Sequence, residues 1–248
     1  MQHELTPGEV VLVGGGPGDP DLLTVAGLRA IVQADVIVHD RLGANEALAQ
    51  ARPEAEIIPV GKIPRGDFTP QEVINDLLVA KARLGLRVVR LKGGDAYVFG
   101  RGGEEVLACA KADVPVRVIP GVTSAVSVPE LAGIPVTHRG VSQGFTVVSG
   151  HVGPSDPRSQ LDWGALARSA TTLVLLMAVQ NLAEIAEALV TGGMDSGTPA
   201  AIVADGSTQQ QQRFDGTLAD IGSVAKAAAV RPPAIVVIGD VVTALDPV

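Results

Sequence analysis

The sequence has few of the residues on which several large classes of protein depend. Only 2% of its 248 residues are aromatic and its formal net charge is −8, so it lacks the stacking platforms and the positive surface of a general nucleic-acid-binding protein. Cys109 is the only cysteine, which excludes an intrachain disulfide and a cluster of thiolate metal ligands. We expect Cys109 to be a small, buried, apolar side chain in a helix.

Long apolar runs are also missing. The longest, LVLLMAV at 173–179, is much shorter than the roughly 20 residues that a helix needs to cross a bilayer. The first residues, MQHELTPGEVV, lack the charged region and the apolar stretch of a signal peptide. The sequence therefore predicts a cytoplasmic protein with no membrane partner.

Histidines are equally sparse. They are His3, His39, His138 and His151, and their spacings are not those of metal ligands. The sequence therefore predicts no metal site.

What the chain does contain is a regular alternation of short apolar runs and stretches with helical periodicity. Apolar runs without polar alternation are typical of strands that are covered on both faces in a parallel sheet. In the first half these predicted strands are 9–14, 35–40, 56–61, 87–93 and 114–121. Predicted helices lie between them, and the one that begins near Thr69 has a threonine cap, Pro70 at its first position and Glu72 three residues after the cap.

A segment rich in glycine, proline and polar residues, 133–144, separates this set of elements from a second one. The second set has predicted strands at 145–150, 171–177, 199–204, 213–218 and 233–239. Helical periodicity returns between them at 181–193 and 217–228. We therefore predict the α/β class, with two α/β domains at residues 1–138 and 139–248.

Two glycine-rich loops follow predicted strands, at 14–19 and 93–103. The first, GGGPGD, stands where a dinucleotide fold carries G-x-G-x-x-G, but Asp19 replaces the third glycine and Pro17 removes an N–H donor. A carboxylate would repel a pyrophosphate, and the P-loop pattern is absent from the chain. The loops therefore favour a ligand without phosphate, and a nucleotide-binding oxidoreductase remains the alternative from another class.

Charged residues collect at the ends of the predicted strands, where open α/β sheets bind their ligands. Asp40 and Lys62 each end an apolar run, and each is either a solvated charge or a functional one. Arg90 and Arg101 flank the second loop and either form surface ion pairs with neighbouring glutamates or bind an acidic ligand. Asp95 either caps the helix that follows or accepts a hydrogen bond from a ligand.

Taken in order, the motifs of this chain resemble those of the tetrapyrrole methylase family. They are GGGPGDPDLLT, VHDRL, VGK, TPQEVIN, VVRLKGGDAYVFGRGGEE, PGVTSA, GIPVTHR, LVLLMAV and PAIVVIG, from about Glu9 to Val242. GxGPGD is shared by the whole family, whereas the RLKGGD…FGRGGEE block and PQ-x-x-IN resemble the members that methylate uroporphyrinogen III. The resemblance implies the class III methyltransferase fold, two α/β domains with a cleft between them, and a homodimer.

The same resemblance implies an activity and a cofactor. It implies two successive transfers of a methyl group from S-adenosyl-L-methionine to uroporphyrinogen III, which give precorrin-2 through precorrin-1 and leave S-adenosyl-L-homocysteine. The product would feed sirohaem and cobalamin synthesis. A related family member that methylates precorrins at a later stage is the nearer alternative.

Individual site residues also follow from the resemblance. It implies a proton acceptor at Asp40, a proton donor at Lys62 and further residues needed for activity at Asp19, Arg90 and Arg101. The cofactor contacts that it implies are Pro17, Gly93, Gly94, Asp95, Val98, Thr123, Ser124, Met177, Gly206 and Ala234. From its place in an apolar strand alone, Met177 would be a core residue.

The implied substrate carries eight carboxylates, so an acidic protein needs arginines gathered near its site. The candidates are Arg41, Arg65, Arg90, Arg101 and Arg139. Two departures from the family pattern lie beside them: Ala96 replaces a proline after GGD, and the segment 63–71 lacks the histidine that commonly precedes PQ. We expect the second departure to affect the substrate side of the site.

Overall fold

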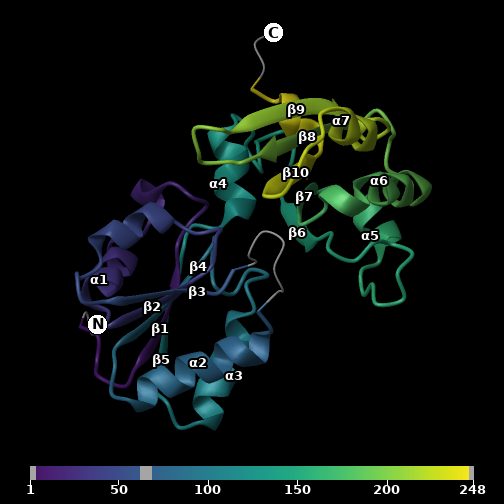
Figure 1. Ribbon diagram of the computed structural model, residues 1–248. Helices are drawn as coiled ribbons and strands as arrows, with labels where there is room; N and C mark the ends of the chain where they lie inside the picture. Colours follow the sequence, from purple (N-terminus) through teal and green to yellow (C-terminus); the bar gives the residue numbers. More distant parts are fainter. Residues whose placement is uncertain (1–3, 62–68, 246–248) are drawn as a thin grey trace. The chain divides into compact units, whose positions relative to one another are not determined.

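The computed structural model describes residues 4–61 and 69–245, and the chain divides into two compact units, Met1–Thr123 and Ser124–Val248 (Figure 1). Each unit contains one five-stranded sheet with its own hydrophobic core. The predicted α/β class with two α/β domains is therefore confirmed. Among the described residues, no helix is long and apolar enough to cross a membrane.

The sheet of the first unit is entirely parallel, with strand order β3-β2-β4-β1-β5. Its strands are β1 (Val10–Gly14), β2 (Val36–His39), β3 (Glu56–Pro59), β4 (Val88–Lys92) and β5 (Val116–Ile119). Because all five run in the same direction, their carboxyl ends lie along one edge of the sheet. The loops that follow the strands therefore meet at that edge.

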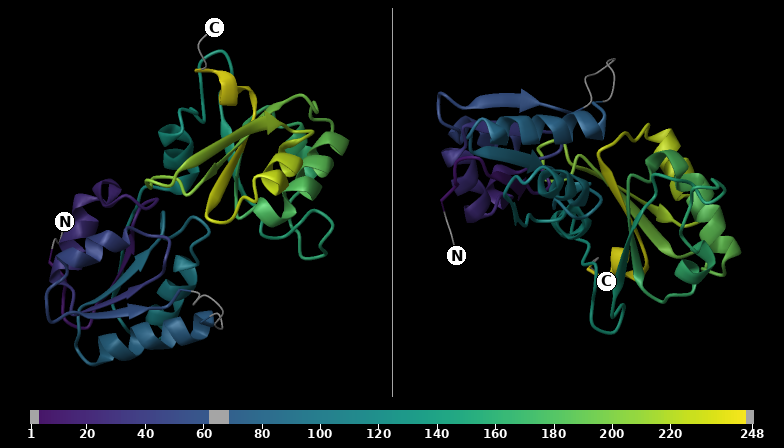
Figure 2. Two further views of the ribbon diagram at one scale, coloured as in Figure 1. Left: turned by 45° about the horizontal axis from the view of Figure 1, so that its top comes forward. Right: turned by 90° about the horizontal axis from the view of Figure 1, so that it is seen from below.

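Helices cover both faces of this sheet (Figures 1 and 2). They are α1 (Val25–Gln33), α2 (Gln71–Arg83) and α3 (Gly102–Lys111), with short 3-10 helices η1 (Pro20–Leu22) and η2 (Asn45–Gln50). Ile31 of α1 packs in one core cluster with Val11 and Val13, whereas Leu78 of α2 packs in the other with Val10 and Leu12. Alternate residues of β1 thus enter opposite cores, which is why the strand is apolar throughout.

The predicted capping box at the start of α2 is wrong. The helix begins at Gln71, one residue later than the cap at Thr69 requires, so Pro70 occupies the N-cap position. Within the described part of the chain, no side chain caps this first turn. Gln71 turns its amide into the protein instead and donates to Asn75 Oδ1 at 3.0 Å.

The sheet of the second unit is mixed, with order β6-β7-β10-β8-β9. β6 (Phe145–Ser149) and β7 (Thr172–Leu176) are parallel, whereas β10 (Ala234–Ile238), β8 (Pro199–Ala204) and β9 (Gln212–Thr217) pair antiparallel. The β8–β9 pair forms the long ribbon seen in Figure 2. One core contains residues of α5 (Trp163–Ala167), α6 (Leu182–Thr191) and α7 (Ile221–Ala227). The elements of this unit also include η3 (Val179–Asn181) and η4 (Asp240–Thr243).

Helix α4 (Ser124–Leu131) covers the other face of the second sheet. Its Ala125 and Val128 pack in one core cluster with Val174, Val203 and Val237. Because of this packing the chain passes from the first compact unit to the second between Thr123 and Ser124. The glycine- and proline-rich segment had led us to place the domain boundary after residue 138. Composition marks a local turn, but long-range packing decides to which unit a helix belongs.

Candidate active site

The two glycine-rich loops predicted from the sequence lie side by side at the carboxyl edge of the first sheet. Gly15 N donates to Lys92 O at 2.6 Å, directly after β1 and β4. Gly16 and Gly94 then exchange two backbone hydrogen bonds, of 3.1 and 2.7 Å. The loops are therefore joined through their backbones, as expected for loops that follow neighbouring parallel strands.

Much of the glycine content serves close backbone packing. A Cβ atom on Gly14 would lie 2.4 Å from Gly121 N, and one on Gly121 would lie 2.4 Å from Gly94 O. Gly94 also has a φ of +64°, a conformation that costs other residues strain. The loops after β1, β4 and β5 thus interlock where a larger residue does not fit.

Asp95 joins the same loops through its carboxylate. Its Oδ1 accepts from Tyr97 N at 2.9 Å and its Oδ2 accepts from Gly121 N at 3.0 Å. The alternative that Asp95 caps the following helix is wrong, because α3 begins at Gly102 and Arg101 occupies its N-cap.

Asp40 follows β2 at this edge and is held by the backbone. Its carboxylate accepts from Leu42 N at 2.9 Å and from Gly93 N at 3.2 Å, and its side chain is 24% exposed. An Arg90 guanidinium nitrogen lies 3.6 Å away. Asp40 is therefore an oriented carboxylate with one part of its surface accessible, not a freely solvated charge.

Arg90 forms an ion pair with a neighbouring glutamate, one of its two predicted alternatives, but this pair is buried and not at the surface. Only 4% of the residue is exposed, its Nε donates to Glu105 Oε1 at 2.9 Å and one terminal nitrogen donates to Leu91 O at 2.8 Å. Lys92, two residues further along β4, binds the same glutamate. Burial lowers the pKa of Lys92, as does the charge of Arg90, while Glu105 acts in the opposite direction.

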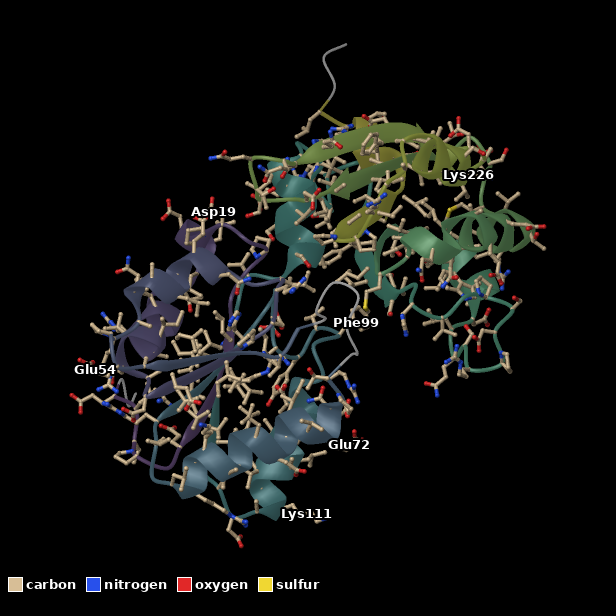
Figure 3. The ribbon with its side chains drawn as sticks, viewed as in Figure 1. Asp19, Glu54, Glu72, Phe99, Lys111 and Lys226 are labelled. Atoms are coloured by element: carbon tan, nitrogen blue, oxygen red, sulfur yellow. The ribbon has the colours of Figure 1, made fainter. Side chains whose placement is uncertain are left out.

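Arg101 forms a surface ion pair with a neighbouring glutamate, which was one of its two predicted alternatives. It lies at the exposed N-cap of α3 with a φ of +58°, and its guanidinium binds both oxygens of Glu104 at 2.7 Å. This hydrogen bond lowers the pKa of Glu104. Asp19 is the N-cap of η1, where its Oδ1 accepts from Asp21 N at 2.8 Å (Figure 3). The predicted residues Lys62 and Arg65 lie outside the described residues.

Three of the predicted cofactor contacts of the second unit meet at one edge of its sheet. Met177 follows the last residue of β7, Gly206 follows β8 by two residues, and Ala234 begins β10. The register pairs Ala234 with Ala204 and Ile235 with Leu176, which brings the three positions to the same side. The remaining contacts are divided between the units: Pro17, Gly93, Gly94, Asp95, Val98 and Thr123 in the first and Ser124 in the second.

Met177 is not a core residue. It has a φ of +56° and is 47% exposed, because the chain turns sharply where β7 ends. The interpretation from its apolar strand was wrong, whereas exposure is compatible with the ligand contact that the resemblance implies.

Sequence reasoning missed two aromatic side chains beside the glycine loops. Tyr97 is 58% exposed and Phe99 is 44% exposed, and Phe99 lies in the loop that follows β4 (Figure 3). The sequence could have indicated them, because the chain has only one Trp, one Tyr and four Phe, and two of these six fall within the motif GGDAYVFGRGG. Exposed aromatic rings in a glycine-rich loop suit a flat organic ligand with polar edges.

The comparison with family models identifies the class of protein. The model of the Tetrapyrrole (Corrin/Porphyrin) Methylases matches residues 9–222, so the chain belongs to this family. It is therefore an enzyme of methyl transfer, and the family resemblance seen in its motifs is confirmed.

Individual relatives are more specific. Over 240 residues the chain is 50% identical to a uroporphyrinogen-III C-methyltransferase of Methanocaldococcus jannaschii, covering 96% of this chain and 98% of the relative. It is 46% identical to a siroheme synthase of Methylobacillus flagellatus, of which it spans 51%. Among solved structures, it resembles a uroporphyrin-III C-methyl transferase of Thermus thermophilus in complex with S-adenosyl homocysteine. The TM-score is 0.80 and the identity is 42%, and the match covers 96% of this chain and 100% of the solved chain.

Proposed function

We propose that this protein transfers a methyl group from S-adenosyl-L-methionine to a ring carbon of uroporphyrinogen III. The observation that carries the proposal is the carboxyl edge of the first sheet, where Gly93 and Arg90 of the RLKGGD motif lie against Asp40. The relative from Methanocaldococcus jannaschii, similar over nearly its whole length, supports the same substrate.

We further propose that the reaction runs twice, giving precorrin-2 through precorrin-1. The product would then serve sirohaem or cobalamin synthesis, and the similarity to half of a siroheme synthase supports the first of these. A later precorrin methylation is the alternative, and the PQ-x-x-IN and GRGGEE segments favour uroporphyrinogen III over it.

The residues at the two strand edges suit a sulfonium cofactor better than a dinucleotide. Asp40 and Asp95 place carboxylates at the glycine loops, where they would repel a pyrophosphate and are compatible with a positive sulfonium. The cofactor, when bound, supplies an electrophilic methyl group. We propose that Pro17, Gly93, Gly94, Asp95, Val98 and Thr123 bind it from the first unit, and Ser124, Met177, Gly206 and Ala234 from the second.

In this proposal Asp40 accepts the proton that the macrocycle loses after methylation, and Lys62 donates one. Asp40 is suited to this role because two backbone N–H groups orient its carboxylate while part of it stays accessible. The exposed aromatic rings of Tyr97 and Phe99, in the loop that follows β4, would exclude water from a bound ligand. Methyl transfer between sulfur and carbon depends chiefly on alignment in a water-poor site.

Exposed arginines would bind the carboxylates of the substrate. Arg41, Arg101 and Arg139 are exposed and can take this role, with Asp19 shaping the adjacent loop. Arg90 cannot, because it is buried and its guanidinium is already bound within the protein. We therefore propose that Arg90 acts through Asp40.

A mass measurement tests the activity directly. The protein is incubated without oxygen with uroporphyrinogen III and S-adenosyl-L-methionine, and the tetrapyrrole is then analysed by mass spectrometry. We expect a gain of two methyl groups. No gain, with S-adenosyl-L-homocysteine still bound, would reject this substrate; methylation of a precorrin in a parallel incubation would favour the alternative.

We also propose a cytoplasmic homodimer. A single buried cysteine is compatible with a reducing compartment. Sedimentation equilibrium of the purified protein would measure its mass, and a monomer at micromolar concentration would contradict the dimer.

A further inference from the structure

A second cluster of charges lies beneath the edge of the first sheet, between β4, α2 and α3. Its centre is Glu105, whose side chain is fully buried. Arg90 Nε lies 2.9 Å and Lys92 Nζ 3.0 Å from its carboxylate. Gln71 Nε2, at the start of α2, lies 3.4 Å from the same Oε1 atom and 3.0 Å from Asn75 Oδ1.

This cluster unites three motifs that are separate in the sequence. Arg90 and Lys92 belong to RLKGGD, Glu105 belongs to GRGGEE, and Gln71 and Asn75 belong to PQEVIN. Their side chains form one polar network inside an apolar core. A buried network of this kind is costly unless its members satisfy one another, so each residue depends on the others.

The network reaches Asp40 through Arg90. One terminal nitrogen of the guanidinium donates to Leu91 O and lies 3.4 Å from Val38 O, while the other lies 3.6 Å from Asp40 Oδ2. The planar fork of arginine thus joins the ends of β2 and β4 in one geometry, which a lysine could not do. Asp40 in turn accepts from Gly93 N.

The distances indicate how Arg90 is shared between the two carboxylates. The contact of Arg90 with Glu105, at 2.9 Å, is a direct ion pair, whereas its distance to Asp40, at 3.6 Å, is longer than a normal hydrogen bond. Two cations and two carboxylates make the set formally neutral. If Glu105 lost its charge, Arg90 would retain Asp40 as its nearest anion.

We propose that Glu105 is a positioning residue that holds Arg90 away from Asp40, so that Asp40 stays on the backbone N–H groups of Gly93 and Leu42. This inference rests on the proposed function only in giving Asp40 a catalytic task. Without the charge of Glu105, Arg90 and Asp40 close into a direct ion pair, and the carboxylate leaves Gly93.

The first test needs no substrate. Backbone amide signals of Gly93 and Leu42 are recorded by ¹H–¹⁵N NMR in the wild type and in Glu105→Gln, with Asp40→Asn showing how the signals respond when the carboxylate is lost. We expect both signals to shift upfield in Glu105→Gln, because their hydrogen bonds to Asp40 weaken. Wild-type positions for both signals would overturn the proposal.

Glu9→Gln is the matched control. Glu9 binds Arg117 Nε at 2.9 Å and its side chain is 12% exposed, but it precedes β1 at the opposite edge of the same sheet. The substitution removes a carboxylate charge from an ion pair in the same unit, so the Gly93 and Leu42 signals should keep their wild-type positions.

The second test uses the reaction. In Glu105→Gln we expect kcat to fall by about 10–100-fold, while the Kd for S-adenosyl-L-homocysteine changes by less than about threefold. An unchanged kcat would contradict the positioning role, as would equal losses in kcat and cofactor affinity. If the wild type does not methylate uroporphyrinogen III, the proposed function fails and the amide signals still decide this inference.

Glu105→Gln leaves two buried cations against one carboxylate, so the variant is expected to lose stability. Combining it with Lys92→Met restores formal neutrality, and the double variant should melt at a higher temperature than Glu105→Gln alone. Arg90 still lacks a charged partner on α3 in the double variant, so the Gly93 and Leu42 signals should still move. Signals at their wild-type positions in a folded double variant would overturn the proposal.

Discussion

At the scale of single residues, what a charged side chain can do depends on its hydrogen-bond partners and on its exposure. Asp40 and Arg90 both end up near the glycine loops, but Asp40 is partly accessible and Arg90 is not. An accessible, oriented carboxylate can exchange a proton with a ligand, whereas a buried guanidinium can only organise its neighbours. We therefore propose different roles for these two residues, although both were candidate functional charges in the sequence.

Asp40→Asn should retain cofactor affinity and lose turnover. The amide has nearly the shape of the carboxylate but cannot accept a proton, so we expect kcat to fall by about 10²–10⁴-fold. Calorimetry with S-adenosyl-L-homocysteine and steady-state kinetics would measure the two effects separately. Unchanged turnover would remove Asp40 from the proposed mechanism.

Because of Cys109, we expect the free energy of unfolding to decrease as the pH becomes alkaline. Burial raises the pKa of its thiol to about 11, with the charge of Glu105 adding to the effect. The folded state therefore resists forming the thiolate, and stability is lost as the pH rises from the unfolded value near 9 towards 11. Urea unfolding at pH 8 and pH 10.5 should show a decrease of about 2 kcal/mol in the wild type. Cys109→Ala should lack this component; an equal decrease in both proteins would contradict it.

At the scale of helices and strands, glycine positions decide how closely elements approach. Gly206, after β8, is the clearest case in the second unit: a Cβ atom there would lie 2.4 Å from Val128 Cγ1 of α4. Gly103 in α3 is the opposite case, with no atom within 4 Å of an added Cβ. The first glycine is required by packing, whereas the second is not.

Gly206→Ala should therefore destabilise the protein by about 1–3 kcal/mol through overpacking against α4. Combining it with Val128→Ala should recover part of this loss, because the smaller side chain makes room for the new methyl group. Gly103→Ala is the control and should stabilise the protein by about 0.5–1 kcal/mol, as expected for an exposed helical position. Chemical unfolding of the variants would measure these differences, and additive effects of the first two substitutions would contradict the contact.

At the scale of the whole molecule, the chain consists of two units with separate cores, and predicted cofactor contacts occur in both. A ligand that binds the folded protein raises its apparent stability in proportion to the logarithm of its concentration. S-adenosyl-L-homocysteine at about 100 times its Kd should stabilise the protein by roughly 3 kcal/mol. NADH at the same concentration should leave the melting temperature unchanged; stabilisation by NADH alone would favour a dinucleotide site.

Much of this protein could be predicted from the sequence. Local composition determines the strands of the first unit, the helices between them and the glycine loops at their ends. Each of these segments can therefore be predicted from its own residues. The motif GGGPGD, together with the order of the motifs that follow it, indicated the family. Close backbone approaches of this kind require glycine, so they can be recognised from the sequence. The convergence of Asp40 with Gly93 also followed, since parallel strands end at one edge.

Other features were decided only by tertiary structure. The antiparallel pairing of β10 with β7 and β8, the packing of α4 on the second sheet and the exposure of Met177 depend on which surfaces meet. A surface ion pair of Arg90 with a neighbouring glutamate was one of two alternatives from the sequence, and its pair with Glu105 is instead buried. The physical reason is that local sequence determines conformational preference, whereas burial and strand direction arise from contacts between segments that are distant along the chain.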